Sequence, residues 1–232
     1  MTDSILFWNA VALEANRVSH SDPSKMEQTG PPLSSRALAI VHLAMYDAYA
    51  GVENNPTNTG NFPRYLPAPA PPAGATSLPD SVAGAAYWTL KELFKTQKDF
   101  FDGQLSAFIH SIPPNPPNPS FDFGVAVAQA ILAERAADPG VGDNGYMVHS
   151  GKCRHRVDPD NPAQGYHAPF YGAQSKGFAI STRWKLGQPP CDNAEYLTAF
   201  NQVRAKGIKP ELMGTLLPNP LFNRPLAKVI RG

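Results

Sequence analysis

Proline placement constrains the fold of this chain more than any other feature. The 232 residues include 25 prolines and 18 glycines, which divide the chain into helical patches and irregular connectors. A helix rarely continues through proline, because proline lacks the amide hydrogen and its ring clashes with the preceding turn. The densest proline clusters lie in a connector from Gly51 to Leu78 and in a run from Pro113 to Pro119. Helices must therefore lie between these clusters.

Apolar residues recur at helical spacing in the remaining segments. Runs of alternating β-branched or aromatic residues, which would indicate strands, do not exceed about four residues. The fold class is therefore all-α, an irregular helical domain with long Pro/Gly-rich loops, and we expect a single domain over residues 1–232. The predicted helices cover about 4–19, 35–50, 79–94, 98–111, 121–137 and 192–206.

Capping residues refine several of these boundaries. Ser34 or Ser35 is the expected N-cap of the second helix, and Pro79 suits the first position of the third. Asp192 followed by Glu195 resembles a capping box at the last helix. Small residues around Gly84 would let another helix approach closely. The predicted core-facing positions are Ile5, Trp8, Val11, Ala12 and Ala15 in the first helix, Leu38, Val41, His42, Met45, Tyr46 and Tyr49 in the second, and Tyr196, Phe200 and Val203 in the last.

Composition excludes several classes of partner. The net charge of +1 gives no electrostatic reason to expect nucleic acid or an anionic membrane. No apolar run approaches the roughly 20 residues that a membrane span requires, and the first residues do not resemble a secretory signal. Cys153 and Cys191 could form one bridge, but we favour two free thiols. The cellular compartment is left open.

Several sequence blocks carry a resemblance to a known family. The opening ILFWNAVALEANRVSH and the stretch GPPLSSRALAIVHLAMYDAY, which ends at Tyr49, are similar to the N-terminal region of the vanadium-dependent haloperoxidases. The resemblance is closest to the fungal chloroperoxidase type. It continues at SVAGAA from Ser81, and at YHAPFYG from Tyr166 through Lys176 to Ala179. These blocks follow one another in the family's order.

The resemblance implies a mostly helical oxidoreductase, a peroxidase. Vanadate in a helical bundle would bind hydrogen peroxide and oxidise chloride or bromide to a hypohalous species. The acid phosphatases share this fold and anion site, because phosphate has the shape and charge of vanadate. A buried oxyanion needs several cationic or N–H donors to offset its desolvation. In the family, these come from a lysine seven residues before Arg-Pro, a Pro-Ser-Gly-His block, and an arginine followed by the histidine that bonds vanadium.

None of these motifs can be carried over to this chain. Arg224-Pro225 exists, but Leu217 stands where the lysine should be. Ser150-Gly151-Lys152 lies in the wrong order and lacks the histidine, and no histidine lies downstream of His167. We therefore assign no catalytic, cofactor-binding or metal-binding residue to this chain. Either the chain is a piece of a longer enzyme, which we favour, or it is a complete protein whose catalytic half is lost or supplied in trans.

Three other groups of residues are candidates for chemistry, each with a structural alternative that we favour. Arg36, His42 and Asp47 share one helix and are candidates for contacting the vanadate-binding half. In the alternative, Arg36 and Asp47 form buried ion pairs or tie down loops, and His42 is a core histidine with satisfied hydrogen bonds. A polar loop could bind zinc, although Arg154 and Arg156 would repel a cation. An aromatic cluster could line a channel, or pack a loop on helices. The loop residues are His149, Cys153, His155 and Asp158, with His167 nearby; the aromatic cluster is Tyr166, His167, Phe170 and Tyr171.

Three functions follow as hypotheses. The chain is the N-terminal scaffold of a vanadium-dependent haloperoxidase and is inactive alone, with a C-terminal catalytic half as its partner. Alternatively, it is a non-enzymatic helical module that forms a homodimer or binds a partner chain. The third hypothesis is a small metalloenzyme that uses the loop from His149 to His167.

Overall fold

The computed structural model describes residues 3–54, 61–108, 118–142, 145–163, 165–182, 187 and 191–207. The chain divides into two compact units, of which the first comprises Met1–Tyr146 and Tyr166–Ser181. The second comprises Met147–Gly165 and Thr182–Gly232. The expectation of one domain over residues 1–232 stays a prediction.

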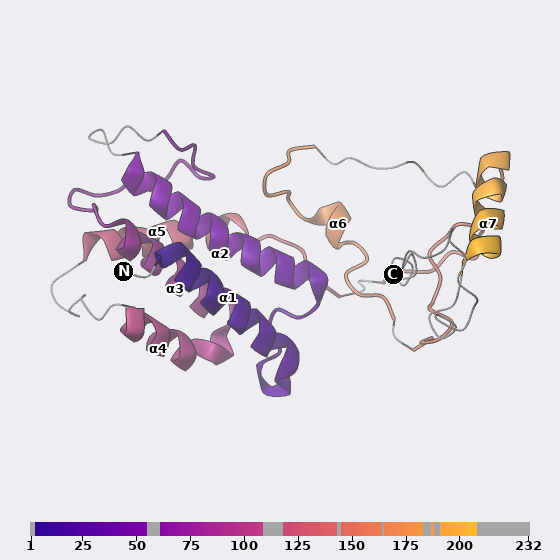
Figure 1. Ribbon diagram of the computed structural model, residues 1–232, viewed down its shortest axis with the longest axis horizontal. Coiled ribbons are helices and arrows are strands. Elements are labelled where there is room, and N and C mark those ends of the chain that lie inside the picture. The colour runs from indigo at the N-terminus through magenta and orange to yellow at the C-terminus, as the bar shows by residue number, and fades with distance from the viewer. Residues whose placement is uncertain are drawn as a thin grey trace. The chain divides into compact units, whose positions relative to one another are not determined.

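The described residues form helices and loops and contain no strand (Figure 1). The all-α class is therefore confirmed, and each of the six predicted segments holds a helix. A four-residue helix, α6, lies within the aperiodic stretch after Val141. The elements are α1 (Ser4–Ser21), η1 (Pro23–Lys25), α2 (Gly30–Glu53), α3 (Leu78–Leu93), η2 (Lys95–Gln97), α4 (Lys98–Phe108), α5 (Pro119–Glu134), α6 (Tyr171–Gln174) and α7 (Ala194–Lys206).

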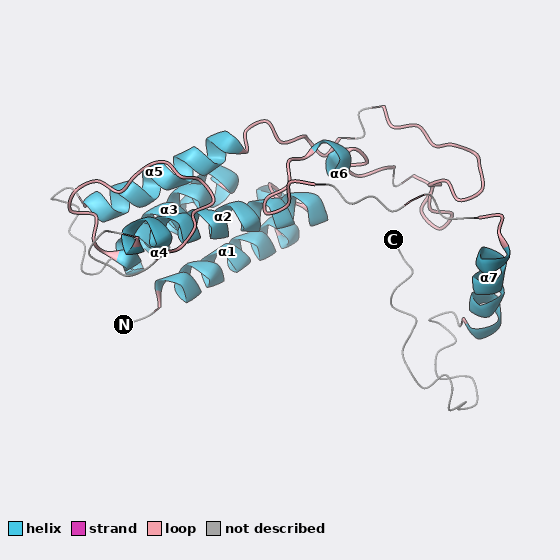
Figure 2. Ribbon diagram, turned by 90° about the horizontal axis from the view of Figure 1, so that it is seen from above, coloured by secondary structure: helices cyan, strands magenta, loops and turns pink. Residues whose placement is uncertain are grey.

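Helix α3 is the central element of the first unit. It contacts α1, α2, α4 and α5, and α1 and α2 run side by side in both ribbon views (Figures 1 and 2). The core between these helices holds the predicted positions Trp8, Val11, Ala12 and Ala15 of α1 and Val41 and Met45 of α2. Its largest fully buried apolar side chains are Trp8, Phe94, Phe101, Phe123, Ile40, Met45 and Leu90. Burial of these side chains removes water from apolar surface, which is the main favourable term in folding.

The closest helix contact joins α3 to α5 through two glycines. A Cβ atom added at Gly84 would lie 2.2 Å from the carbonyl oxygen of Phe121. One added at Gly124 would lie 2.0 Å from the carbonyl oxygen of Ser81. The two backbones touch where neither residue has a side chain, so the predicted close approach at Gly84 is confirmed.

The first turn of α3 agrees with the predicted capping residues, whereas the start of α2 does not. Ser77 caps α3 by accepting the amide of Asp80, with Pro79 in the first turn as expected. The predicted N-cap of α2 is wrong, because the helix already begins at Gly30, behind Thr29. Proline is tolerated in a first helical turn, where the missing N–H would be unpaired anyway. Ser34 and Ser35 therefore lie inside α2, and their hydroxyls donate to backbone carbonyls.

Some residues expected to face the core are exposed instead, including Phe200 and Val203 of the last predicted helix, at 52% and 59%. Ile5 is 40% exposed and Tyr46 is 38% exposed, so both lie at the edges of their stripes. Tyr46 uses its hydroxyl to hold the connector, donating to the carbonyl of Pro63. The connector residues Tyr65 and Leu66 pack on the core, whereas Phe62 is 38% exposed.

In the second unit, α7 begins at Ala194, with the side chain of Asn193 accepting the amide of Tyr196. The predicted Asp192–Glu195 capping box is therefore wrong. Asp192 lies one residue too early and forms an ion pair with Lys152 at 2.9 Å. The expectation of free thiols is also wrong, because Cys153 and Cys191 form a disulfide. Their Cα atoms lie 6.2 Å apart, within the range that a disulfide spans.

Within the described ranges, no helix is both long and apolar enough to cross a bilayer. Arg224-Pro225 and Leu217 lie outside the described residues, as does most of the run from Pro113 to Pro119.

Candidate functional site

Asp47 is fully buried on α2 and holds the proline-rich connector. Its Oδ1 accepts the amide of Tyr65 at 2.6 Å, and its Oδ2 accepts the amide of Leu66 at 2.8 Å. A buried carboxylate is stable only where donors replace its water, and here two consecutive backbone amides do so. The carboxylate thus ties down a loop, as the structural alternative for Asp47 proposed.

His42 joins α2 to α1. Its Nδ1 lies 2.7 Å from the carbonyl oxygen of Leu38, and its Nε2 lies 2.9 Å from the Oδ1 of Asn9. Both ring nitrogens are therefore engaged within the helical unit. This half-buried imidazole has no ring nitrogen left over to bond vanadium or to transfer a proton.

Arg36 and Arg135 converge on one carboxylate, that of Asp138. The Nε of Arg36 lies 2.6 Å from the Oδ2 of Asp138, and the same oxygen accepts the Nε of Arg135 at 2.9 Å. The Nη2 of Arg135 lies 2.9 Å from the Oδ1. Arg36 also donates from its Nη2 to the backbone carbonyl of Arg135 at 2.8 Å. The network joins α2 to the end of α5, and the favoured ion-pair role of Arg36 is confirmed.

Arg135 extends this network to the segment that follows α6. Its side chain is fully buried and its Nη2 donates to the carbonyl of Lys176 at 2.8 Å. The guanidinium carbon lies 3.8 Å from the ring centre of Phe178, which is a cation–π contact. Sequence analysis missed Arg135 and Asp138. The available signal was their spacing of three residues at a helix end, directly before Pro139.

These residues do not fit vanadate. An oxyanion site needs cationic groups that converge on an open position, but both arginines already face the carboxylate of Asp138. Their charge is partly neutralised, and the side chain of Asp138 is only 5% exposed. Asp138 thus occupies the place that an anion would take, and we derive no chemistry through vanadate on these residues.

The aromatic cluster lies in the first unit and includes Tyr146, which the sequence prediction omitted. The ring centre of Tyr146 lies 4.8 Å from that of Tyr166 and 5.7 Å from that of Phe170. Burial, and then the nearby carboxylate of Asp138, raise the pKa of Tyr171. The phenol of Tyr171 is therefore held in the protonated form. The influence of Asp138, Arg36 and Arg135 on this pKa shows that Tyr171 lies near the arginine network. The cluster packs a loop, as the structural alternative proposed.

His167 lies against the start of α2. A Cβ atom added at Gly30 would lie 2.7 Å from its Nε2, and Gly30 adopts a φ of +79°, which disfavours any side chain. The amide of Gly30 donates to the Nε2 of His20 at 3.2 Å. Because Gly30 has no side chain, the rings of both His20 and His167 can lie against the backbone at the start of α2.

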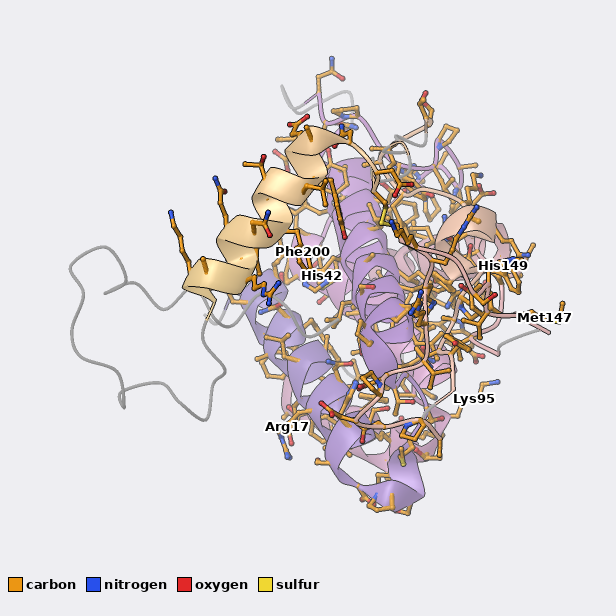
Figure 3. The ribbon with its side chains drawn as sticks, turned by 90° about the vertical axis from the view of Figure 1, so that its right-hand side faces the viewer. Arg17, His42, Lys95, Met147, His149 and Phe200 are labelled. Carbon is orange, nitrogen blue, oxygen red and sulfur yellow. A yellow bond between two sulfur atoms is a disulfide. The ribbon has the colours of Figure 1, made fainter. Side chains whose placement is uncertain are left out.

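The polar loop of the second unit does not gather into a metal centre. Within the part of the chain that the structure describes, no three His, Cys, Asp or Glu side chains come close enough to share an ion. The sulfur of Cys153 is bonded to Cys191, so no thiolate is available there. His149 is exposed (Figure 3). Asp158 accepts the amide of Asp160 at 2.9 Å, which stabilises a turn.

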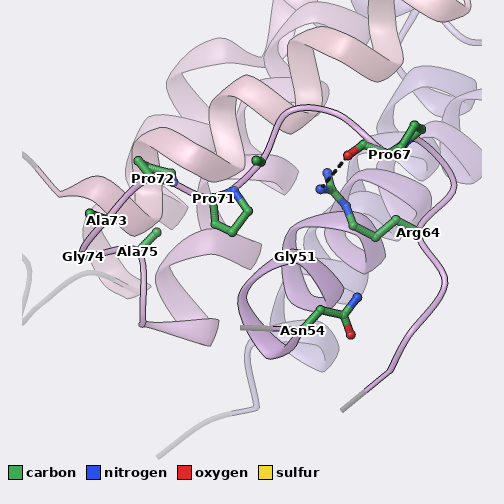
Figure 4. Close-up of a pocket in the computed structure, with 10 residues that line it drawn as sticks. Gly51, Asn54, Arg64, Pro67, Pro71, Pro72, Ala73, Gly74 and Ala75 are labelled. Atoms are coloured by element: carbon green, nitrogen blue, oxygen red, sulfur yellow. Dashed lines mark hydrogen bonds between the residues drawn. The ribbon is translucent and has the colours of Figure 1, made fainter. Parts of the chain in front are cut away.

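A cavity of about 360 Å³ lies between the end of α2 and the proline-rich connector (Figure 4). Its lining is mostly small residues and proline, and the charged side chain in it is Arg64. The Nη1 of Arg64 donates to the carbonyl of Pro69 at 2.7 Å, whereas its Nε and Nη2 are buried without a hydrogen-bond partner. The guanidinium faces the ring of Phe123 at 5.7 Å. Burial lowers the pKa of Arg64, against the opposing effect of Asp47. This arrangement holds the connector against α2.

Comparison with known proteins agrees with this architecture. A family model described as the vanadium chloroperoxidase N-terminal domain matches residues 1–177. The chain is also similar to vanadium chloroperoxidase of Curvularia inaequalis, with 33% identity over 255 aligned positions. That alignment covers 89% of this chain and 41% of the Curvularia protein, so the chain spans about two fifths of its relative's length. The chain belongs to the family of vanadium chloroperoxidase N-terminal domains.

Proposed function

We propose that this chain is the N-terminal scaffold of a vanadium-dependent haloperoxidase and that it does not turn over alone. The family reaction is the peroxide-driven oxidation of halide to hypohalous acid. The observation that carries the proposal is the use of Arg36, His42 and Asp47. Each of these three side chains holds another segment of the helical unit, through Asp138, Asn9 and the connector respectively. A scaffold needs such contacts, whereas a vanadate site needs the same groups unpaired.

The outer side of α1 supports a partner role for this scaffold. Leu6 is 67% exposed and Leu13 is 50% exposed, and the two lie seven residues apart on the side away from Trp8. Exposed apolar side chains at helical spacing suit helix packing against further protein. We propose that a C-terminal catalytic half, in the same or another chain, covers this side.

Halogenation assays test the proposal. The purified chain, incubated with vanadate, hydrogen peroxide, bromide and a dye that reports bromination, should give no turnover above the same mixture without protein. The Curvularia chloroperoxidase serves as the positive control. Vanadate titration followed by ⁵¹V NMR should show no broadened protein-bound signal. Turnover by this chain, lost on chelation or displacement of vanadate by phosphate, would contradict the proposal.

The alternative function is a non-enzymatic module that dimerises or binds a partner chain. It predicts the same silent assay but an oligomer in solution. The two functions therefore separate by molecular mass.

A further inference from the structure

The cavity beside the proline-rich connector contains a cation with unused hydrogen-bonding capacity. The Nη1 of Arg64 donates to the carbonyl of Pro69 at 2.7 Å. Its Nε and Nη2 are buried, and no described residue accepts a hydrogen bond from either. A buried N–H without an acceptor is costly, and more so on a charged group. Such a group in a native protein calls for a water or an ion as its partner.

The two unused nitrogens lie on the same edge of the guanidinium. The N–H bonds of Nε and Nη2 run parallel along this edge, so the edge matches the two oxygens of one carboxylate. Asp47 acts on Arg64 through its charge but forms no hydrogen bond with it. Both carboxylate oxygens of Asp47 already accept amides, from Tyr65 and Leu66. The edge therefore remains available for a carboxylate from outside the described residues.

The surroundings of Arg64 favour an acid with an apolar body. The cavity of about 360 Å³ is at the lower end of the range for small-molecule sites. Figure 4 shows the guanidinium between Gly51, Pro67 and Pro71, and most of the lining is proline, alanine and glycine. Arg64 is the charged side chain of this lining. One positive charge suits one carboxylate, whereas phosphate or vanadate needs several cationic groups to offset its desolvation.

The connector wall from Pro67 to Pro72 can yield to admit such a ligand. Four of these six residues are prolines, which have no N–H to tie the wall to neighbouring segments. The wall is held at the carbonyl of Pro69 by Arg64 itself, and at the carbonyl of Pro72 by the amide of Ala75. Because Nε and Nη2 are covered in this conformation, a carboxylate reaches them only with a small movement of this wall. We therefore expect weak binding.

We infer that this cavity binds a small monocarboxylic acid, whose carboxylate pairs with the Nε and Nη2 of Arg64 and whose apolar part lies among the prolines. The Kd should be about 1 mM, because one charged pair must offset both the movement of the wall and the lost freedom of the ligand. The inference goes beyond the proposed function, and its test does not involve halogenation.

Benzoate is a suitable probe, since it joins one carboxylate to a compact apolar ring. Added to the ¹⁵N-labelled chain at constant ionic strength, benzoate should shift one arginine Nε–H resonance and the backbone amide of Gly51 with the same saturable dependence. Benzamide has the same shape without the charge and should bind at least about tenfold more weakly. Phosphate should also bind more weakly. An absent or non-saturable shift would mean that Arg64 binds water only, and equal binding of benzamide would exclude a carboxylate site; either result overturns the inference.

Three variants test the position of the site, with the amide of Gly51 as the reporter. Arg64→Lys keeps the charge but lacks the parallel N–H edge, so benzoate should bind at least about tenfold more weakly. Ala70→Leu narrows the cavity without changing its charge and should weaken binding by about fivefold or more. Arg17→Ala removes an exposed arginine on α1 and should leave the Kd unchanged. An unchanged Kd in Arg64→Lys or in Ala70→Leu overturns the inference; should Arg64→Lys not fold, Ala70→Leu decides.

Discussion

Arg36 and Asp138 lie 102 residues apart in the chain and are joined by an ion pair of 2.6 Å. Arg135, three residues before Asp138, binds the same carboxylate. Two arginines and one carboxylate leave one net positive charge near the buried end of α5. Asp138 is the residue on which both cations depend.

Replacing Asp138 with Ala should therefore be severely destabilising. It leaves two arginines facing each other without a counter-ion, and breaking a buried pair in this way costs about 3–5 kcal/mol of unfolding free energy. Urea unfolding at neutral pH measures the loss. Formate or acetate should restore part of the stability, because either carboxylate can enter the place of the deleted side chain. Glu92→Ala, which removes an exposed acid on α3, should change the unfolding free energy by less than about 0.5 kcal/mol. Equal effects of the two variants would contradict the assigned role.

Glycine substitutions test the contact between α3 and α5. Gly124→Ala should separate the helices, because its Cβ atom would lie 2.0 Å from the carbonyl oxygen of Ser81. Overpacking of this kind costs about 1–3 kcal/mol or more. Gly103→Ala is the matched control, since a Cβ atom there meets nothing within 4 Å. In the interior of α4 it should stabilise by about 0.5–1 kcal/mol. Thermal unfolding followed by circular dichroism should move the two variants in opposite directions.

Asp47→Asn tests the attachment of the connector. One amide oxygen replaces two carboxylate oxygens, so the amide of Tyr65 or that of Leu66 loses its acceptor. A lost bond to a charged acceptor costs about 1.5–3 kcal/mol. Hydrogen exchange should accelerate at both of these amides, while the core amides of α3 keep their protection. Ser35→Ala removes an exposed hydroxyl on the same helix and should leave hydrogen exchange at the connector amides unchanged. Accelerated exchange at these amides in Ser35→Ala would show that the effect is not specific to Asp47.

Ionisation of Tyr87 should lower the stability of the folded chain at high pH. Burial, and then its hydrogen bond of 2.5 Å to Asp102, raise the pKa of Tyr87 from 10.0 to about 12. Because the folded state holds the phenol proton more tightly, the contribution is complete below pH 10 and is lost as the pH rises towards 12. Tyrosinate absorbance should show late ionisation of this tyrosine relative to the unfolded chain. In Tyr87→Phe, unfolding free energy should fall less steeply over the same interval; an identical slope would contradict the assignment.

Local sequence information recovered the elements but not their long-range connections. The spacing of Trp8, Val11 and Ala15 placed α1, since helical periodicity is a property of one segment. The predicted start of α2 lay too late in the sequence, because Pro31 and Pro32 are compatible both with a chain before a helix and with the first turn of that helix. At α7, Asn193 is the cap, and Asp192 instead pairs with Lys152, which lies 40 residues away in the sequence.

The candidate site required tertiary geometry for the same reason. A helix pattern placed Arg36 near a buried face, but its partner Asp138 follows a different helix. The carbonyl of Lys176 that binds Arg135 carries no side-chain signal at all. The disulfide joins two aperiodic segments separated by 38 residues, and cysteine spacing alone does not report whether such segments meet.

That disulfide makes the second unit dependent on the redox conditions under which the chain is produced. Closing a loop of 38 residues removes unfolded-chain entropy worth about 4 kcal/mol. In a cytosol that keeps thiols reduced, the base of α7 would lose this covalent link and keep the exposed ion pair of Asp192 with Lys152, which contributes little. Protein recovered from a reducing expression host should therefore be reoxidised before its mass is measured, and thiol titration should accompany every preparation.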